Sequence, residues 1–284
     1  MCGIIVVSKS SSIDKSTMNH RGPDQYSEEV YKELRVGYFR LAITGGVEGN
    51  PPVTSRVGNW QVFLNGEIYN YKKLMSSYSL PETESDSQVL ADGLEKIGIG
   101  FIKNLKGMFA GFAISLKDGR IYCFRDPIGE KPLFYTQANG VLEFASEVKA
   151  LASNTRIEKR INSKAVMSFL QFGYVEEPDT IYSDIKSVGR GCIFEISNSA
   201  TELNLIGVID PSSYVENNMP LRDLVLEIVE EQFSYSGKSS LLLSSGVDSS
   251  LLFKLGRHFN KGVRPIVHGQ LLDFREREWI LASN

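Results

Sequence analysis

The sequence predicts two consecutive domains of different class: an α+β domain that takes up most of the chain, and the beginning of an α/β domain. Short runs of β-forming residues separated by turn signals dominate the first part of the chain, with few helical patterns between them. After residue 220, helical and strand patterns alternate, which is typical of a parallel sheet covered by helices. The stretch between the two patterns is rich in Asp, Pro, Ser and Asn and predicts a linker.

Each element of the first domain, residues 2–206, has a local signal. Runs of β-branched, aromatic and other apolar residues predict strands at 4–7, 36–43, 60–64, 108–115, 120–125 and 141–144. Ser85 and Gln88 have the spacing of an N-terminal cap, and the amphipathic residues that follow predict a helix to about residue 97. A second helix is expected at residues 163–171.

The linker is expected at residues 207–220, and residues 221–284 follow it. Their pattern predicts helices at 221–233 and 249–258, strands at 240–243 and 263–267, and a further helix from Phe274. Two strands cannot form a stable open sheet with both faces covered. We therefore expect this part to be only the N-terminal portion of its domain.

Composition excludes several classes of protein. With 284 residues, 42% of them hydrophobic and 23% charged, the chain resembles an ordinary soluble protein. The net charge of −3 lacks the basic signature of a nucleic-acid-binding protein. No apolar run is long enough to cross a membrane, and the N-terminus lacks the basic region of a signal peptide. Cys2, Cys123 and Cys192 are too widely spaced for a disulfide framework or a metal cluster, so we expect a cytoplasmic protein without a protein-bound metal.

Cys2 is the first candidate catalytic residue. Once Met1 is removed, Cys2 carries both a thiol and a free α-amine, whose ordinary pKa of about 7.7–8.0 suits a general base near neutral pH. Gly3 would let a substrate approach the backbone closely. The alternative is a buried cysteine that happens to precede the first strand.

Further polar residues could complete an acyl-transfer site. In the stretch LNGEIYN, Asn65 and Gly66 follow a predicted strand and could supply N–H donors to an oxyanion, and Glu67 could hold an ammonium group. Arg40 ends another predicted strand and suits a carboxylate, while Asp86 in the first turn of a helix could be a second ammonium partner. The alternatives are an ordinary Asn-Gly turn and a solvated arginine.

A second candidate site lies in SSLLLSSGVDSSLL, where a predicted strand, a loop of small residues and a helix follow one another. Hydroxyl and N–H groups at a helix N-terminus favour an anion, and a polyphosphate is the natural ligand. The alternative is a serine-rich turn in an α/β sheet.

Taken together, the motifs resemble a known family. MCGI, HRGPD, RLAIT, NGEIYN, SDSQ, GMFAGFAI, RDPIGEKPLFY and FASEVKAL occur in the order seen in class II glutamine amidotransferases of the asparagine synthetase family. The resemblance covers nearly the whole chain. It implies that residues 2–206 form a class II glutaminase domain with the αββα sandwich of N-terminal-nucleophile hydrolases.

The resemblance also implies a role for each candidate residue. Cys2 would attack the side-chain amide of glutamine, ammonia would leave, and water would hydrolyse the glutamyl thioester. Asn65 and Gly66 would form the oxyanion hole. Arg40 would bind the α-carboxylate, with Leu41 and Ile43 beside it. Glu67 and Asp86 would hold the α-amino group. The loop with His20 and Arg21 would shape and close this pocket.

The segment SSGVDSS is similar to the SGGxDS pyrophosphate loop of ATP-pyrophosphatases, which belong to the adenine nucleotide α-hydrolase-like fold. This similarity implies that ATP is a substrate, accompanied by Mg²⁺. The nucleotide-binding residues would be Leu243, Ser244, Ser245, Gly246, Asp248 and Ser249. Ser245 stands where the pattern has glycine.

The resemblance therefore implies an ATP-dependent, glutamine-hydrolysing amidotransferase, above all one that converts aspartate to asparagine. A companion chain could supply the rest of the synthetase domain, and a homodimer is possible. Two alternatives stay open. The acceptor could be another small carboxylate, such as a sugar acid of a surface polysaccharide. The chain could also be a stand-alone glutaminase or a glutamine-sensing module.

Overall fold

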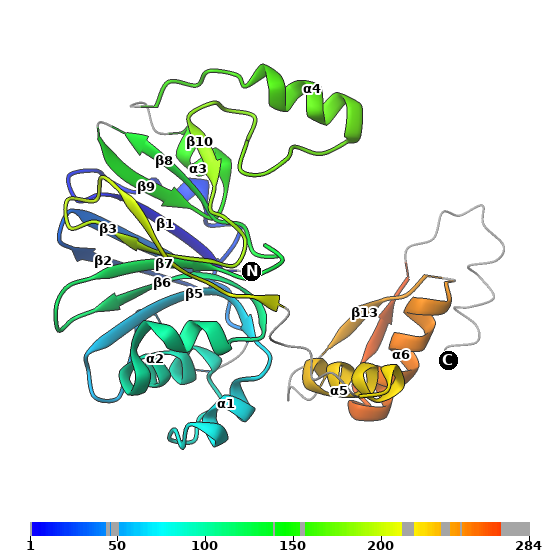
Figure 1. Cartoon of the computed structure of the whole chain (residues 1–284). Helices are drawn as coiled ribbons and strands as arrows, with labels where there is room; N and C mark the ends of the chain where they lie inside the picture. Colours follow the sequence, from blue (N-terminus) through cyan, green and yellow to red (C-terminus); the bar gives the residue numbers. More distant parts are fainter. Residues whose placement is uncertain are drawn as a thin grey trace. The chain divides into compact units, whose positions relative to one another are not determined.

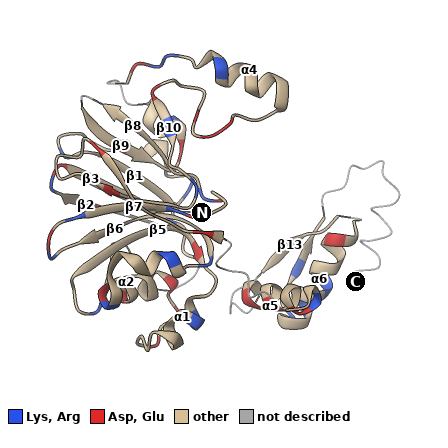
Figure 2. Cartoon of the chain, in the orientation of Figure 1, with Lys and Arg blue, Asp and Glu red and all other residues tan. Residues whose placement is uncertain are grey.

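The computed structural model describes residues 2–43, 46, 51–138, 140–153, 157–211, 219–233, 239–244 and 246–267. The chain divides into two compact units, Met1–Tyr214 and Val215–Asn284. The division between the units falls inside residues 207–220, where the linker is expected. The glutaminase role expected before it and the synthetase role expected after it stay predictions. Residues of both charge signs lie on helices, strand ends and loops of the first unit (Figure 2).

The first sheet of unit 1 has the strand order β10-β8-β9-β1-β3-β2. Its strands are β1 (Gly3–Ser8), β2 (Gln25–Tyr31), β3 (Leu34–Arg40), β8 (Phe134–Ala138), β9 (Val141–Ala145) and β10 (Ile185–Ser187). All neighbouring strands pair antiparallel. β1 lies between β3 and β9, so Cys2 enters the sheet near its middle (Figure 1).

The second sheet has the order β12-β11-β7-β6-β5-β4 and is also antiparallel. Its strands are β4 (Val53–Thr54), β5 (Trp60–Ile68), β6 (Gly107–Ser115), β7 (Ile121–Arg125), β11 (Cys192–Ile196) and β12 (Leu203–Val208). β5 pairs with β6 along its whole length, from Trp60 to Ile68. The prediction that this strand ends at residue 64 is therefore wrong, and Asn65, Gly66 and Glu67 lie within β5 rather than after it.

Besides its two sheets, unit 1 contains helices, which lie beside the strands in Figure 1. They are α1 (Tyr71–Ser77), α2 (Asp86–Ile97), α3 (Val148–Ala152) and α4 (Ser163–Phe172), with 3-10 turns η1 (Lys15–Thr17) and η2 (Gly98–Asn104). The predicted cap is confirmed, because the side chain of Ser85 accepts a hydrogen bond from the Gln88 N–H at 3.2 Å. α2 packs on β4 and β5, and α3 packs on β8 and β9. The expected α+β sandwich is confirmed.

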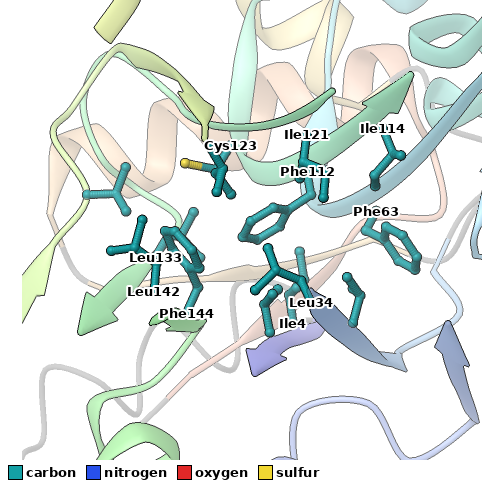
Figure 3. Close-up of a cluster of buried hydrophobic side chains, with 14 of the residues drawn as sticks. Ile4, Leu34, Phe63, Phe112, Ile114, Ile121, Cys123, Leu133, Leu142 and Phe144 are labelled. Atoms are coloured by element: carbon teal, nitrogen blue, oxygen red, sulfur yellow. The ribbon is translucent and has the colours of Figure 1, made fainter. Parts of the chain in front are cut away.

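The hydrophobic core lies between the two sheets (Figure 3). Alternate residues of a strand share one face. Ile4 and Val6 of β1 therefore face Phe63 of β5 and Phe112 of β6 across the layer. The rings of Phe112 and Phe144 meet edge to face with centroids 5.3 Å apart, which joins β6 of one sheet to β9 of the other. The core fixes how far apart the strands of the two sheets lie.

Unit 2 alternates helices and strands. It contains α5 (Leu221–Phe233), β13 (Ser240–Leu242), α6 (Val247–Phe259) and β14 (Arg264–Ile266), and its two strands pair in parallel. This order confirms the predicted helix–strand alternation up to residue 267, while the helix expected from Phe274 lies outside the described residues. Among the residues described, no helix combines the length and apolarity needed to cross a membrane.

The core packing predicts a large difference between two apolar truncations. Phe112→Ala should lower the free energy of unfolding by about 3–5 kcal/mol, because it removes a fully buried ring that contacts both sheets. Leu205→Ala, on a side chain that is 56% exposed, should change it by less than about 0.5 kcal/mol. Urea unfolding followed by circular dichroism measures both. Equal effects of the two substitutions would contradict the assigned core.

Candidate active site

A pocket opens at the end of the core layer, where the strands β1, β3 and β5 carry polar instead of apolar residues. It is lined by Cys2, Tyr38, Arg40, Leu41, Ile43, Leu64, Asn65, Gly66, Glu67, Ser85, Asp86, Ser87, Met108 and Lys131. The structure thus brings together all the residues that the sequence assigned to catalysis and glutamine binding. Their individual roles stay predictions.

Strand alternation explains this convergence. On β3, Tyr38 and Arg40 continue the inward-facing row of Val36. On β5, Asn65 and Glu67 likewise continue the row of Phe63. The polar side chains of the pocket therefore lie where the apolar rows of the core end.

Cys2 is partly exposed, and its sulfur contacts the main chain of Leu41, the residue that directly follows β3. The Leu41 N–H donates to Sγ at 3.5 Å, and Sγ lies 3.7 Å from the Leu41 carbonyl oxygen. The Arg21 Nε donates to the Cys2 carbonyl oxygen at 3.0 Å, while its Nη1 pairs with Glu147 at 3.0 Å. Cys2 is therefore held at its sulfur and at its carbonyl.

The other two cysteines lie outside this pocket. Burial raises the pKa of the Cys123 thiol, with a further contribution from the nearby Cys192. Burial also raises the pKa of Cys192. Because the thiolate is the nucleophilic form, both are poor nucleophiles near neutral pH.

The loop of the HRGPD motif supports the site from outside. His20 is half exposed and pairs with Glu147 at 2.8 Å, and neither His20 nor Arg21 is among the residues that line the pocket. Asp24 accepts a hydrogen bond from the Ala42 N–H at 2.8 Å. Gly22 lies so close to β3 that a Cβ would stand 2.2 Å from the Phe39 carbonyl oxygen. These contacts place the loop against β3, and its expected role in shaping and closing the pocket stays a prediction.

Asn65 has the features of a hydrogen-bond donor that awaits a ligand, and Gly66 beside it has a backbone conformation that suits only glycine. Asn65 is fully buried, and neither polar atom of its side chain has a hydrogen-bond partner among the described residues. Such a group costs about 1–3 kcal/mol and is retained mostly where function needs it. Gly66 has a φ of +143°, and a Cβ there would lie 1.9 Å from the Met108 carbonyl oxygen. Only glycine fits this position.

Two carboxylates share the pocket. Burial raises the pKa of Glu67, and the charge of Asp86 raises it further, against an opposing effect of Lys131. Burial also raises the pKa of Asp86, although the N–H groups of Ile68 and Ser87 donate to it at 2.9 and 2.7 Å and lower it. An ammonium group bound between these carboxylates would favour the charged form of both.

Arg40 supplies the opposite charge. It is 8% exposed, and its Nη2 donates to the Gly46 carbonyl oxygen at 2.6 Å. A guanidinium from β3 and two carboxylates from β5 and α2 in one pocket suit a ligand that carries both a carboxylate and an ammonium group. With a thiol and unpaired amide donors beside them, these charges describe a site for acyl chemistry on an α-amino acid.

Sequence reasoning missed several lining residues, above all Tyr38, Met108 and Lys131. Tyr38 stands two residues before Arg40 on the same strand, so strand alternation was a signal that could have found it. Lys131 had no such signal. It follows a turn organised by Asp126, whose carboxylate accepts from the N–H groups of Gly129 at 2.6 Å and of Lys131 at 3.0 Å. Burial lowers the pKa of Lys131, and Glu67 opposes this.

The second candidate site, in unit 2, has the predicted order of strand, loop and helix. Leu243 is buried, and Asp248 lies in the first turn of α6. Within the loop, Ser244 N–H donates to the Ser249 hydroxyl at 3.2 Å, and Gly246 N–H donates to the Ser244 hydroxyl at 3.2 Å. Ser245 lies outside the described residues. Among the residues that the structure does describe, no group of three or more His, Cys, Asp or Glu could hold a metal ion.

Comparison with known proteins gives three kinds of match. Residues 1–205 match a family described as the glutamine amidotransferase domain. Asparagine synthetase (glutamine-hydrolyzing) 2 of Bacillus subtilis (strain 168) is 29% identical over 252 residues, which cover 82% of this chain and 34% of that protein. Asparagine synthetase (glutamine-hydrolyzing) 1 of the same organism is 29% identical over 262 residues, covering 86% and 40%. The chain spans less than half the length of these two relatives.

Among solved structures, a glutamine phosphoribosylpyrophosphate amidotransferase from B. subtilis, complexed with ADP and GMP, is similar to the chain. The match has a TM-score of 0.43 and 15% sequence identity, and it covers 96% of this chain and 61% of that chain.

The geometry of β5 predicts that Gly66 tolerates no side chain. Gly66→Ala should lower the free energy of unfolding by about 2–5 kcal/mol, because a positive φ and a backbone clash act together. Gly58 is a matched control, since its φ is +93° but a Cβ there would meet nothing within 4 Å. Gly58→Ala should cost only the conformational strain, about 1–2 kcal/mol. Thermal unfolding of both variants measures the difference, and equal losses would refute the close approach at Gly66.

Proposed function

The chain belongs to the glutamine amidotransferase domain family, and on that basis we propose that it hydrolyses the side-chain amide of glutamine with Cys2 as the nucleophile. Membership makes the protein an enzyme that takes its amide nitrogen from glutamine. The observation that carries the residue assignment is the pocket itself. It unites a thiol, two unpartnered amide atoms of Asn65 and charges of both signs.

Binding would use the charges of both signs in the pocket. Arg40 would hold the α-carboxylate of glutamine, with Leu41 and Ile43 beside it, and Glu67 with Asp86 would hold the α-ammonium group. The pKa values of both acids are raised, and the substrate's ammonium would favour their charged forms. This arrangement selects an L-α-amino acid and leaves its side chain directed at Cys2.

The chemical steps follow from the positions of the donors. With Met1 removed, the α-amine of Cys2 accepts the thiol proton, and the thiolate adds to the amide carbon of glutamine. The Nδ2 of Asn65 and the N–H of Gly66 would stabilise the oxyanion, a contribution of about 100- to 1,000-fold per donor. The C–N bond then breaks, and the nitrogen takes the proton from the α-ammonium of Cys2 and leaves as ammonia. Water hydrolyses the thioester to glutamate and regenerates the thiol.

For the ammonia, the proposed destination is a carboxylate activated by ATP. The similarity to two asparagine synthetases supports aspartate as the acceptor, and the loop before α6 supports ATP as the activating nucleotide. The nucleotide would be bound by Leu243, Ser244, Ser245, Gly246, Asp248 and Ser249. Phosphate oxygens would replace the hydroxyl groups that now accept from the N–H groups of Ser244 and Gly246. Mg²⁺ would accompany the nucleotide, and further parts of the synthetase would come from residues beyond these or from a companion chain.

Removal of the proposed nucleophile separates the two half-reactions. Cys2→Ala should lower glutamine hydrolysis to the background rate, because no other group in the pocket can form the thioester. Synthesis driven by added ammonium salt should be unaffected, in the chain alone or with its companion. Glutamate and pyrophosphate release measure the two activities. Glutaminase activity that survives in Cys2→Ala would refute the assignment.

The raised pKa of Glu67 predicts a pH dependence of glutamine binding. As the pH falls through that pKa, the carboxyl is protonated and loses the substrate's ammonium group, so KM should rise at a pH above the ordinary glutamate pKa of about 4.3. Glu67→Gln should raise KM at neutral pH by about 10- to 100-fold and reduce this acid-side increase. Glu29→Gln, at an exposed position of β2, is the control. Identical pH profiles of KM in Glu67→Gln and wild type would contradict the assignment.

A further inference from the structure

Tyr38 occupies a special position in the pocket. Its side chain is 4% exposed, and its hydroxyl donates to the Leu64 carbonyl oxygen at 2.5 Å. Leu64 directly precedes Asn65 on β5. Tyr38 and Cys2 line the same pocket, and Tyr38 lies near enough for the charge of Cys2 to raise the pKa of its phenol. One phenol is therefore bonded to the strand that carries the amide donor and lies in the same pocket as Cys2.

The contact crosses between the two sheets. Cys2 precedes β1, which pairs with β3 in the first sheet, whereas Asn65 belongs to the second sheet. Cys2 and Asn65 are thus attached to different sheets, and the core between the sheets sets their separation. A hydrogen bond from β3 to β5 at the site itself fixes that separation locally.

The phenol keeps its proton. Burial raises the pKa of Tyr38 well above its ordinary value, and the charge of Cys2 raises it further. Tyr38 is therefore a hydrogen-bond donor over the working pH range and not a base. A tyrosine hydroxyl has only one proton to donate. At rest the phenol proton is donated to the Leu64 carbonyl oxygen, and a thiolate at Cys2 would compete with that oxygen for it. The Leu41 N–H is a second donor to the sulfur.

We propose that Tyr38 is a positioning residue. Its hydroxyl joins β3, whose continuation holds the sulfur of Cys2 through the Leu41 N–H, to the main chain of β5 immediately before Asn65. This rests on the proposed glutaminase function. Without the hydroxyl, the separation between the sulfur of Cys2 and the amide of Asn65 would no longer be fixed at the site. Arg40, Glu67 and Asp86 would still hold the substrate. The loss should therefore fall on kcat rather than on KM.

Tyr31 provides a matched control. It lies on β2 of the first sheet, and its hydroxyl donates to Gln61 Oε1 on β5 at 2.6 Å. The ring centroids of Tyr31 and Tyr38 are each 6.1 Å from that of Phe63. Tyr31 thus bridges the same two sheets through the same kind of bond, but it does not line the pocket. A merely structural bridge would make the two tyrosines equivalent.

The test compares Tyr38→Phe with Tyr31→Phe in the full chain. Glutamine hydrolysis gives kcat and KM, and alkylation of the Cys2 peptide by iodoacetamide, followed by mass spectrometry across pH, reports the thiolate directly. Tyr38→Phe should lower kcat by about 10- to 100-fold with KM within about threefold of wild type. The alkylation profile should shift to higher pH by about 0.5–1 unit, because the thiolate loses a donor. Tyr31→Phe should leave both readouts within about twofold of wild type.

Equal kinetic effects of the two variants, or an unshifted alkylation profile in Tyr38→Phe, would overturn the proposal. If Tyr38→Phe does not fold, 3-fluorotyrosine at position 38 keeps the shape and alters the acidity of the hydroxyl. The Cys2 alkylation profile should then move, and a profile identical to wild type would overturn the proposal equally. A wild-type chain that does not hydrolyse glutamine would instead refute the proposed function, since alkylation needs no turnover.

Discussion

The packing of two antiparallel sheets across one hydrophobic layer is the constraint on which the rest of the structure depends. Because side chains alternate along a strand, the inward rows that bury Ile4, Val36 and Phe63 are the same rows that end in the polar residues of the pocket. The spacing of the sheets in the core therefore sets the spacing between Cys2 and Asn65. The geometry of the pocket follows from core packing.

The same burial gives the pocket its electrostatic character. Charges of both signs, from Arg40, Glu67, Asp86 and Lys131, lie largely out of water at the end of an apolar layer. Burial disfavours their charged forms, which is why the pKa values of both acids are raised and that of the lysine is lowered. A ligand of complementary charge relieves this cost. These buried charges cost stability, and a bound α-amino acid would offset part of that cost.

Much of this arrangement could be predicted from local sequence signals, and the failures have physical causes. The place of Cys2 directly before β1, the Ser85 cap and the helix–strand order of unit 2 each follow from a few neighbouring residues. The end of β5 was placed too early because Asn65-Gly66 is a typical turn pair, whereas pairing with β6 carries the strand on to Ile68.

Other features depend on distant parts of the chain. β2 has a largely exposed, polar sequence without the apolar alternation of a strand, and its position at the sheet edge comes from pairing with β3. Lys131 enters the pocket through a turn that Asp126 organises by hydrogen bonds. The spacing and the local propensity of the residues predict neither feature. The pairing of β2 with β3 and the hydrogen bonds of Asp126 form only when the chain is folded.

Covalent labelling with a substrate analogue tests the central claim most directly. In the L-glutamine analogue with a diazomethyl ketone in place of the carboxamide, the diazo carbon takes up one proton. The thiolate then displaces N2 from that carbon and forms a stable thioether. Peptide mass spectrometry should find the adduct on Cys2 alone, in chains that have lost Met1. Excess L-glutamine should suppress it, and the D-isomer should not react. Labelling of Cys123 or Cys192 instead, or equal labelling by both isomers, would contradict a glutamine pocket built around Cys2.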